Sequence, residues 1–229
     1  MLRYWLFVVL TLLVTGVVGY ATFATSRLLR SWKPTQNPLL LLSENGIRLV
    51  LLLAFILFGF LSSLPQVKLG WVWDDLLYES AVGITWGVAI ALFFFGATKW
   101  LVQQGVGGRI YSTVIIEAIL PRSFKEALLV AVAMIPAVVS EELLFRSLLL
   151  GGFSPLAPPL LLLVVSSIVF GLLHSSQGIW GMVGASVGGF LFGILFLWRG
   201  TIVTPVIAHY VANMLQICIA VWWFEPEKG

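Results

Sequence analysis

The chain has 229 residues, of which 60% are hydrophobic and only 10% are charged, and its formal net charge is +3. Soluble domains carry about 25% charged residues, so this composition excludes an ordinary water-soluble fold. No basic cluster indicates a nucleic-acid partner, and the single cysteine, Cys218, excludes an internal disulfide. We therefore expect one integral membrane domain whose surroundings are the lipid bilayer.

Long apolar runs of about 20 residues predict membrane-spanning helices. Small residues near the end of the first run also permit its interpretation as a signal peptide. We expect a retained helix there, because Arg27, Arg30 and Lys33 follow it like a stop-transfer flank. Seven spans are predicted along the chain, over residues 4–24, 46–64, 81–102, 127–150, 159–175, 179–198 and 201–223.

The predicted fold class is all-α, a polytopic transmembrane bundle of about seven to eight helices. Basic residues follow the first and third spans, which places those segments and the C-terminus on the inside of the membrane. Residues 105–126 have apolar side chains at helical spacing and predict either a short interfacial helix or an extension of the fourth span. We divide the single membrane domain into residues 1–126, without motifs, and residues 127–223, which carry the motifs below.

The sixth span is rich in glycine. Gly184 and Gly188 form one GxxxG pattern, and Gly189 and Gly193 form another. Because small residues at this spacing let helices approach closely, the pattern predicts tight packing of this span. It says little about function.

Strongly polar side chains inside the second-half spans are unexpected. A charged side chain at the centre of the bilayer costs roughly 2.5–3.5 kcal/mol on insertion scales, so such residues are rare without a role. They lie in spans four, five and seven. These residues are Glu141, Glu142, Arg146, His174, His209 and Asn213.

Helical spacing predicts how these groups face. Glu142 and Arg146 are four residues apart, so they share a helix face and can form an ion pair. His209 and Asn213 share a face for the same reason. Glu141 points about 100° away from Glu142 around the helix. One glutamate can therefore be held by the arginine while its neighbour faces elsewhere.

The depths of the polar groups are compatible with one site. At about 1.5 Å per residue, Glu141 and His209 both lie roughly 13 Å from the same membrane face. His174 lies deeper, at roughly 22 Å by the same rise, so a tilted helix or an early helix break must bring it level. We expect these three helices to converge on one polar site.

A carboxylate and two imidazoles are the parts of a water-activating centre. Glu141, His174 and His209 can bind zinc, which lowers the pKa of a bound water. A glutamate can instead act as a general base without metal, with the histidines and Asn213 stabilising an oxyanion. Both schemes predict hydrolysis. The structural alternatives are a buried ion pair and histidines that hydrogen-bond across helices. An ion pair with Arg146 accounts for only one of the two glutamates, so these alternatives leave the other unexplained.

The same residues also match a known family pattern. The segment from Glu141 to Arg146 has the form EExxxR, Phe170 to His174 has the form FxxxH, and His209 to Asn213 has the form HxxxN. In this order they resemble the CPBP family, which includes the type II CAAX prenyl proteases and the Abi-like bacteriocin-processing or immunity proteins. The resemblance covers about residues 127–223.

This resemblance implies an intramembrane endopeptidase. Glu141 would activate the attacking water with help from His174, and His209 and Asn213 would stabilise the tetrahedral intermediate. Glu142 and Arg146 would form the supporting pair. Family members are described as metalloproteases or as metal-free glutamate enzymes, and they commonly have about eight helices.

The partners that the resemblance implies are a membrane-associated peptide or protein substrate, prenylated or not, and the expected location is a bacterial-type cell membrane. One alternative function is that of a non-proteolytic immunity or scaffold protein that retains the protease fold. A proton-coupled transporter is another alternative, and it ranks last because the sequence shows no internal repeat.

Overall fold

A computed structural model describes residues 1–29, 31–106 and 117–223, and throughout these ranges the regular structure is helical. Six of the described helical segments are long and apolar enough to cross a membrane, and a shorter apolar helix accompanies them. The protein is thus a multi-pass integral membrane protein, as predicted. The main elements are α1 (Leu2–Leu28), α2 (Leu42–Leu61), α3 (Leu76–Leu101), α5 (Phe124–Glu142), the π-helix η5 (Leu143–Gly151), α6 (Pro159–Leu172), α7 (Gly178–Arg199) and α8 (Val203–Trp223).

Every predicted span corresponds to one of these helices. Two differences affect the site. The fourth span is α-helical only as far as Glu142 and continues as a π-helix, and the fifth span ends at Leu172 rather than at residue 175. The predicted interfacial helix within residues 105–126 falls mainly on residues 107–116, which lie outside the described residues.

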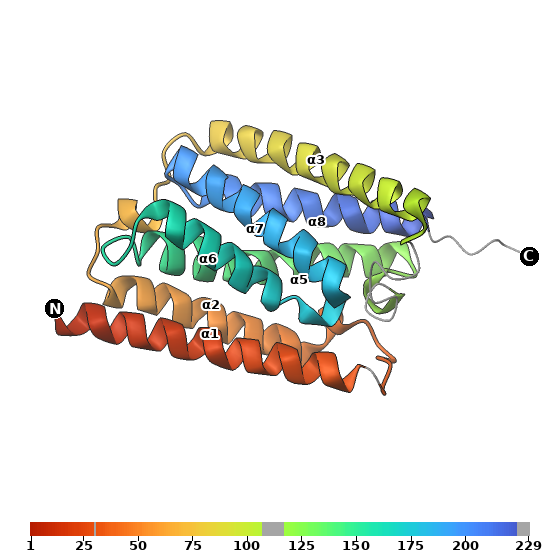
Figure 1. Ribbon diagram of the computed structural model, residues 1–229, viewed down its shortest axis with the longest axis horizontal. Coiled ribbons are helices and arrows are strands. Elements are labelled where there is room, and N and C mark those ends of the chain that lie inside the picture. The colour runs from red at the N-terminus through yellow and green to blue at the C-terminus, as the bar shows by residue number, and fades with distance from the viewer. Residues whose placement is uncertain (30, 107–116, 224–229) are drawn as a thin grey trace, which may run out of the picture.

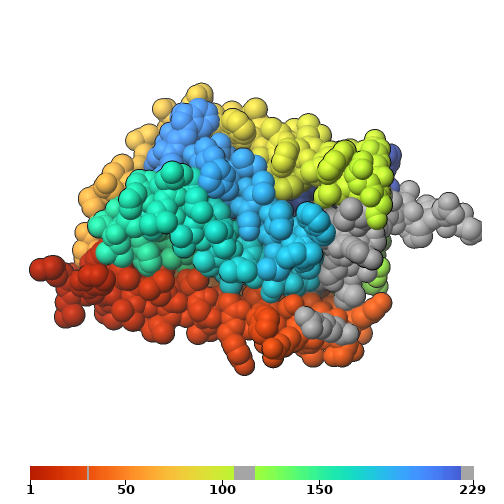
Figure 2. Space-filling view, in the orientation of Figure 1, coloured from red at the N-terminus to blue at the C-terminus, as the bar shows by residue number. Residues whose placement is uncertain are grey.

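The helices lie side by side in one bundle (Figure 1). α1 and α2 form one edge of the view, α3 and α8 form the other, and α6 and α7 cross between them in front of α5. Segment Phe124–Gly151, which joins α5 to η5, has the largest buried share of the six candidate spans. The space-filling view shows α6 and α7 covering it on this face (Figure 2). The segment that carries both predicted glutamates is therefore central.

Glycines set the closest helix contacts. A Cβ atom on Gly87 of α3 would lie 2.7 Å from the carbonyl oxygen of Ala208 in α8, so only a glycine permits this approach. A Cβ on Gly189 of α7 would lie 3.1 Å from the Phe170 ring of α6. The predicted tight packing of the glycine-rich span is thus confirmed at Gly189, and the α3–α8 contact adds a glycine contact that was not predicted.

The connection between α2 and α3 supports the π-helix from one end of the bundle. Ser147 of η5 donates its hydroxyl to the carbonyl oxygen of Leu69 at 2.6 Å and accepts from the indole of Trp71 at 3.0 Å. The carbonyl of Gly70 accepts from the backbone of Ile202 at 2.8 Å, just before α8. These bonds tie η5 and the start of α8 to one loop, which fixes the two segments relative to each other.

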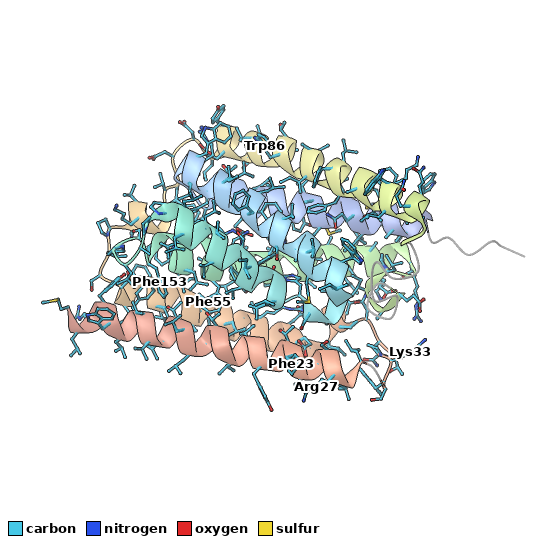
Figure 3. All side chains as sticks on the ribbon, in the orientation of Figure 1. Phe23, Arg27, Lys33, Phe55, Trp86 and Phe153 are labelled. Carbon is cyan, nitrogen blue, oxygen red and sulfur yellow. The ribbon has the colours of Figure 1, made fainter. Side chains whose placement is uncertain are left out.

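Basic side chains gather at the other end of the bundle. Arg27 lies over the Phe23 ring, with its guanidinium 4.5 Å from the ring centroid, and Lys33 lies at the same end (Figure 3). α5 also begins at this end (Figure 1). The segments that were predicted to share one membrane face thus lie at one end of the bundle, and the inward orientation of that end stays a prediction.

Candidate functional site

The predicted ion pair between Glu142 and Arg146 is present and deeply buried. The Arg146 Nε atom lies 3.1 Å from Glu142 Oε2, and the two side chains are 2% and 0% exposed. The guanidinium also donates to the carbonyl oxygen of Gly189 at 3.0 Å. A buried charge needs a partner of opposite sign, and the pair supplies it. Glu142 Oε2 and Arg146 Nη1 have no hydrogen-bond partner among the described residues, so the pair is held mainly by charge.

Glu142 has a second partner that the sequence did not predict. Its Oε1 atom lies 2.7 Å from Nδ1 of His209 in α8. Because a carboxylate oxygen accepts, the proton of this bond belongs to Nδ1, and the Nε2 atom of the ring remains for other contacts. Glu142 therefore uses one oxygen for Arg146 and the other for His209, so it orients the histidine and neutralises the arginine together.

Glu141 differs from its neighbour in every respect that matters for chemistry. Its side chain is 37% exposed, and its nearest charged partner is Nε2 of His209, at 3.8 Å. That distance is too long for a direct hydrogen bond and leaves both groups able to bind a water molecule. The structure therefore brings Glu141 and His209 together as predicted and leaves one carboxylate uncommitted.

His174 lies just beyond α6, because the helix ends early. Its backbone N–H donates to Gly171 at 2.9 Å instead of continuing the α-helical pattern to Phe170. The Phe170 carbonyl instead accepts from Nδ1 of the His174 ring at 2.7 Å. An early helix break was one of the two expected ways to bring His174 level with the other polar groups. The contacts of its ring are with Phe170, so its place beside Glu141 and His209 stays a prediction.

Asn213, like His209, faces α5, but it contacts a different part of that helix. Its Nδ2 atom lies 3.7 Å from the sulfur of Met134, two helical turns before Glu141. The predicted shared face of His209 and Asn213 is therefore confirmed, since both side chains point at α5. The role of Asn213 stays a prediction.

Aromatic rings surround the ion pair, and of these Phe170 belongs to a predicted motif whereas Phe192 does not. The Arg146 guanidinium carbon lies 5.1 Å from the centroid of the Phe170 ring and 5.6 Å from that of Phe192. Its Nη1 atom is buried without a hydrogen-bond partner among the described residues, so cation–π attraction replaces part of its hydration. The Phe192 ring also stacks on His209, with centroids 4.6 Å apart and an interplanar angle of 21°.

The donors do not form a ready metal centre. Among the described residues, no group of three or more His, Cys, Asp or Glu side chains could hold a metal ion. Zinc binding by Glu141, His174 and His209 therefore stays a prediction, and we derive no step through a metal.

A second ion pair, which was not predicted from the sequence, is centred on the buried carboxylate of Glu79. Glu79 of α3 accepts from Arg199 of α7 at 2.6 and 3.1 Å and from the Thr204 hydroxyl of α8. It joins three helices close to the end of the bundle where α8 begins. Because both of its carboxylate oxygens are used, it acts as a structural clamp.

Residues 123–215 match the family model described as Rce1-like, type II CAAX prenyl endopeptidase Rce1-like. The match begins just before α5, ends within α8, and contains all six predicted site residues. Neither the curated proteins nor the solved structures gave a match.

Proposed function

Because residues 123–215 form a domain of the Rce1-like type II CAAX prenyl endopeptidase (CPBP) family, we propose that this membrane protein is an intramembrane endopeptidase. The observation that carries the proposal is the unequal pair of adjacent glutamates. Glu142 is fully buried and bound to Arg146 and His209, whereas Glu141 is partly exposed and 3.8 Å from the free nitrogen of His209.

The proposed reaction begins with a water molecule bound between Glu141 and Nε2 of His209. Glu141 removes a proton from this water while its oxygen forms a bond to the carbonyl carbon of the scissile peptide. The carbonyl π-bond breaks and the negative charge moves to the oxygen of a tetrahedral intermediate. Collapse of the intermediate breaks the C–N bond, and the leaving amine takes the proton back from Glu141.

The oxyanion requires hydrogen-bond donors, and the geometry limits which groups can serve. With its proton on Nδ1, His209 presents only a lone pair at Nε2, so it orients the water as an acceptor. His209 can donate to the oxyanion once Nε2 has taken the second proton of the attacking water, and the Glu142 carboxylate then balances the charge of the ring until that proton leaves to solvent with the carboxylate product. The Asn213 amide is the second donor that the family pattern assigns.

The low-dielectric surroundings strengthen these interactions. His209 and Arg146 are 4% and 2% exposed and Glu142 is fully buried, so the groups that orient the site are shielded from water. Because the Glu141 side chain is partly exposed, water and substrate can reach this base. The family implies a protein substrate in a membrane setting, and we propose a membrane-embedded or lipid-modified peptide.

Purified protein in detergent provides the test, with two probes. One is an internally quenched peptide with a farnesylated CAAX C-terminus, and the other is a set of unprenylated hydrophobic peptides analysed by mass spectrometry. We expect the wild-type chain to cleave one class and Glu141→Ala to lose the cleavage. Glu44→Gln is the matched control, because Glu44 is an exposed carboxylate at the start of α2.

Two results contradict the proposal. One is cleavage by Glu141→Ala at the wild-type rate, which removes Glu141 from the reaction. The other is the absence of cleavage of either probe class by folded wild-type protein, which favours the immunity or scaffold function. Cleavage of only the farnesylated peptide assigns the prenylated substrate class, and cleavage of only the unprenylated peptides excludes it.

A further inference from the structure

The glycine-rich helix α7 carries none of the motif residues, yet two of its groups reach the centre of the site. The Gly189 carbonyl accepts from Arg146 at 3.0 Å, and one turn later the Phe192 ring lies against His209. Phe192 is only 4% exposed and packs in a cluster with Ile90, Leu195, Ala208 and Ala212. Its ring is therefore held in place by packing against α3, α7 and α8.

The histidine ring has two torsions, and the Glu142 bond restrains only part of its motion. A bond from Nδ1 to Glu142 fixes one edge of the imidazole, but the terminal torsion of histidine is broad and allows the ring plane to turn about that edge. The Phe192 ring lies nearly parallel to the imidazole, at 21° and 4.6 Å between centroids. An aromatic ring stacked at this distance restrains the plane of the His209 imidazole.

Two further contacts bear on this restraint, one between Phe170 and His209 and one between Phe192 and Arg146. The Phe170 ring meets His209 edge-on, with centroids 5.9 Å apart, so the imidazole is restrained from a second direction. Phe192 also lies 5.6 Å from the Arg146 guanidinium carbon. The same ring thus contacts both partners of Glu142.

We infer that Phe192 is a positioning residue that holds the His209 imidazole with Nδ1 toward Glu142 and Nε2 toward Glu141. The inference rests on the proposed function for its catalytic consequence, but the ring orientation itself can be measured without a substrate. Phe192 acts through His209 and Arg146 and has no reacting atom of its own.

Nitrogen-15 NMR of histidine-labelled protein tests the orientation, because the chain has only two histidines. The variant His174→Gln assigns the signals by leaving His209 as the one labelled ring. We expect wild-type His209 to show the single Nδ1–H tautomer, and Phe192→Leu to show a mixture of tautomers. Phe192→Tyr, which keeps the flat ring, should restore the wild-type spectrum.

The matched control is Phe196→Leu, one turn further along α7. Phe196 is 5% exposed and packs on Leu150 and Leu163, so it loses the same atoms from a core position away from His209. This control should keep the wild-type tautomer. If Phe192→Leu does not fold, Phe192→Met fills the space with a flexible chain and serves in its place.

Activity is the second readout, on whichever peptide the wild-type protein cleaves. Loss of the Phe192 ring misplaces the His209 imidazole, so we expect kcat of Phe192→Leu to fall by roughly 10- to 100-fold with KM nearly unchanged. An unchanged His209 tautomer in folded Phe192→Leu overturns the inference, whatever the activity shows. A tautomer mixture in Phe192→Leu, beside a wild type that keeps the single tautomer but cleaves neither probe, leaves the positioning role intact and contradicts only the proposed protease.

Discussion

Replacing each of the two adjacent glutamates by glutamine should separate stability from catalysis. In Glu142→Gln the side chain keeps its shape but has only one acceptor oxygen, whereas Glu142 serves Arg146 at 3.1 Å and His209 at 2.7 Å with different oxygens. One of these donors must then face an NH2 group. The arginine charge is also left buried without its counter-charge.

The magnitude follows from the burial of the pair. Breaking a fully buried ion pair by removing one partner costs about 3–5 kcal/mol, which corresponds to a fall in Tm of roughly 6–20 °C on the scale of soluble domains of this length. Glu141 is 37% exposed and 3.8 Å from His209, so its loss resembles that of a surface pair. Glu141→Gln should therefore change stability by less than about 1 kcal/mol.

Thermal unfolding of both variants in one detergent, followed by the fluorescence of the chain's ten tryptophans, measures the difference. The reasoning predicts a large drop for Glu142→Gln and almost none for Glu141→Gln. Equal stability of Glu142→Gln and wild type would refute the structural role of the pair. A drop in Glu141→Gln as large as that in Glu142→Gln would show that the exposed carboxylate has a strong partner.

Two other predictions concern helix contacts. Glu79→Gln should lower stability by about 1.5–3 kcal/mol, because a charged hydrogen bond to Arg199 is lost. The rate of cleavage per folded molecule should stay unchanged, and a loss of about 100-fold, the lower end of a general-base effect, would show that the Glu79–Arg199 pair affects the site. Gly87→Val should lower Tm because its side chain would meet the Ala208 carbonyl; overpacking of this kind costs about 1–3 kcal/mol. A Gly87→Val variant as stable as wild type would show that α3 can move away from α8 freely.

The sequence predicted most of the polar part of the site, since buried charge is conspicuous in an apolar chain. Glu142 and Arg146 pair as their spacing of four residues required, and His209 faces the same centre. The bond between Glu142 and His209 could not be predicted, because these residues are 67 positions apart in the chain. The bond depends on how α5 and α8 are rotated against each other. Spacing within one helix carries no information on that rotation.

The contributions of α7 were missed for a different physical reason. Gly189 acts through its backbone carbonyl and Phe192 through an apolar ring, and neither stands out among hydrophobic residues. The position of His174 beyond its helix was anticipated only as one of two possibilities. Gly171 and the polar residues Ser175 and Ser176 permit an early end. Because glycine is also frequent inside membrane helices, these residues did not decide between an early end and a tilted helix.

The central claim is that Glu141 is the base and Glu142 the residue that holds the site together. The most direct test is kcat of Glu141→Gln, relative to wild type and normalised to folded protein, on a peptide that the wild type cleaves. The account predicts a fall of about 100-fold or more, the range expected for loss of a general base. A kcat within about threefold of wild type, well below the usual general-base effect, would contradict it.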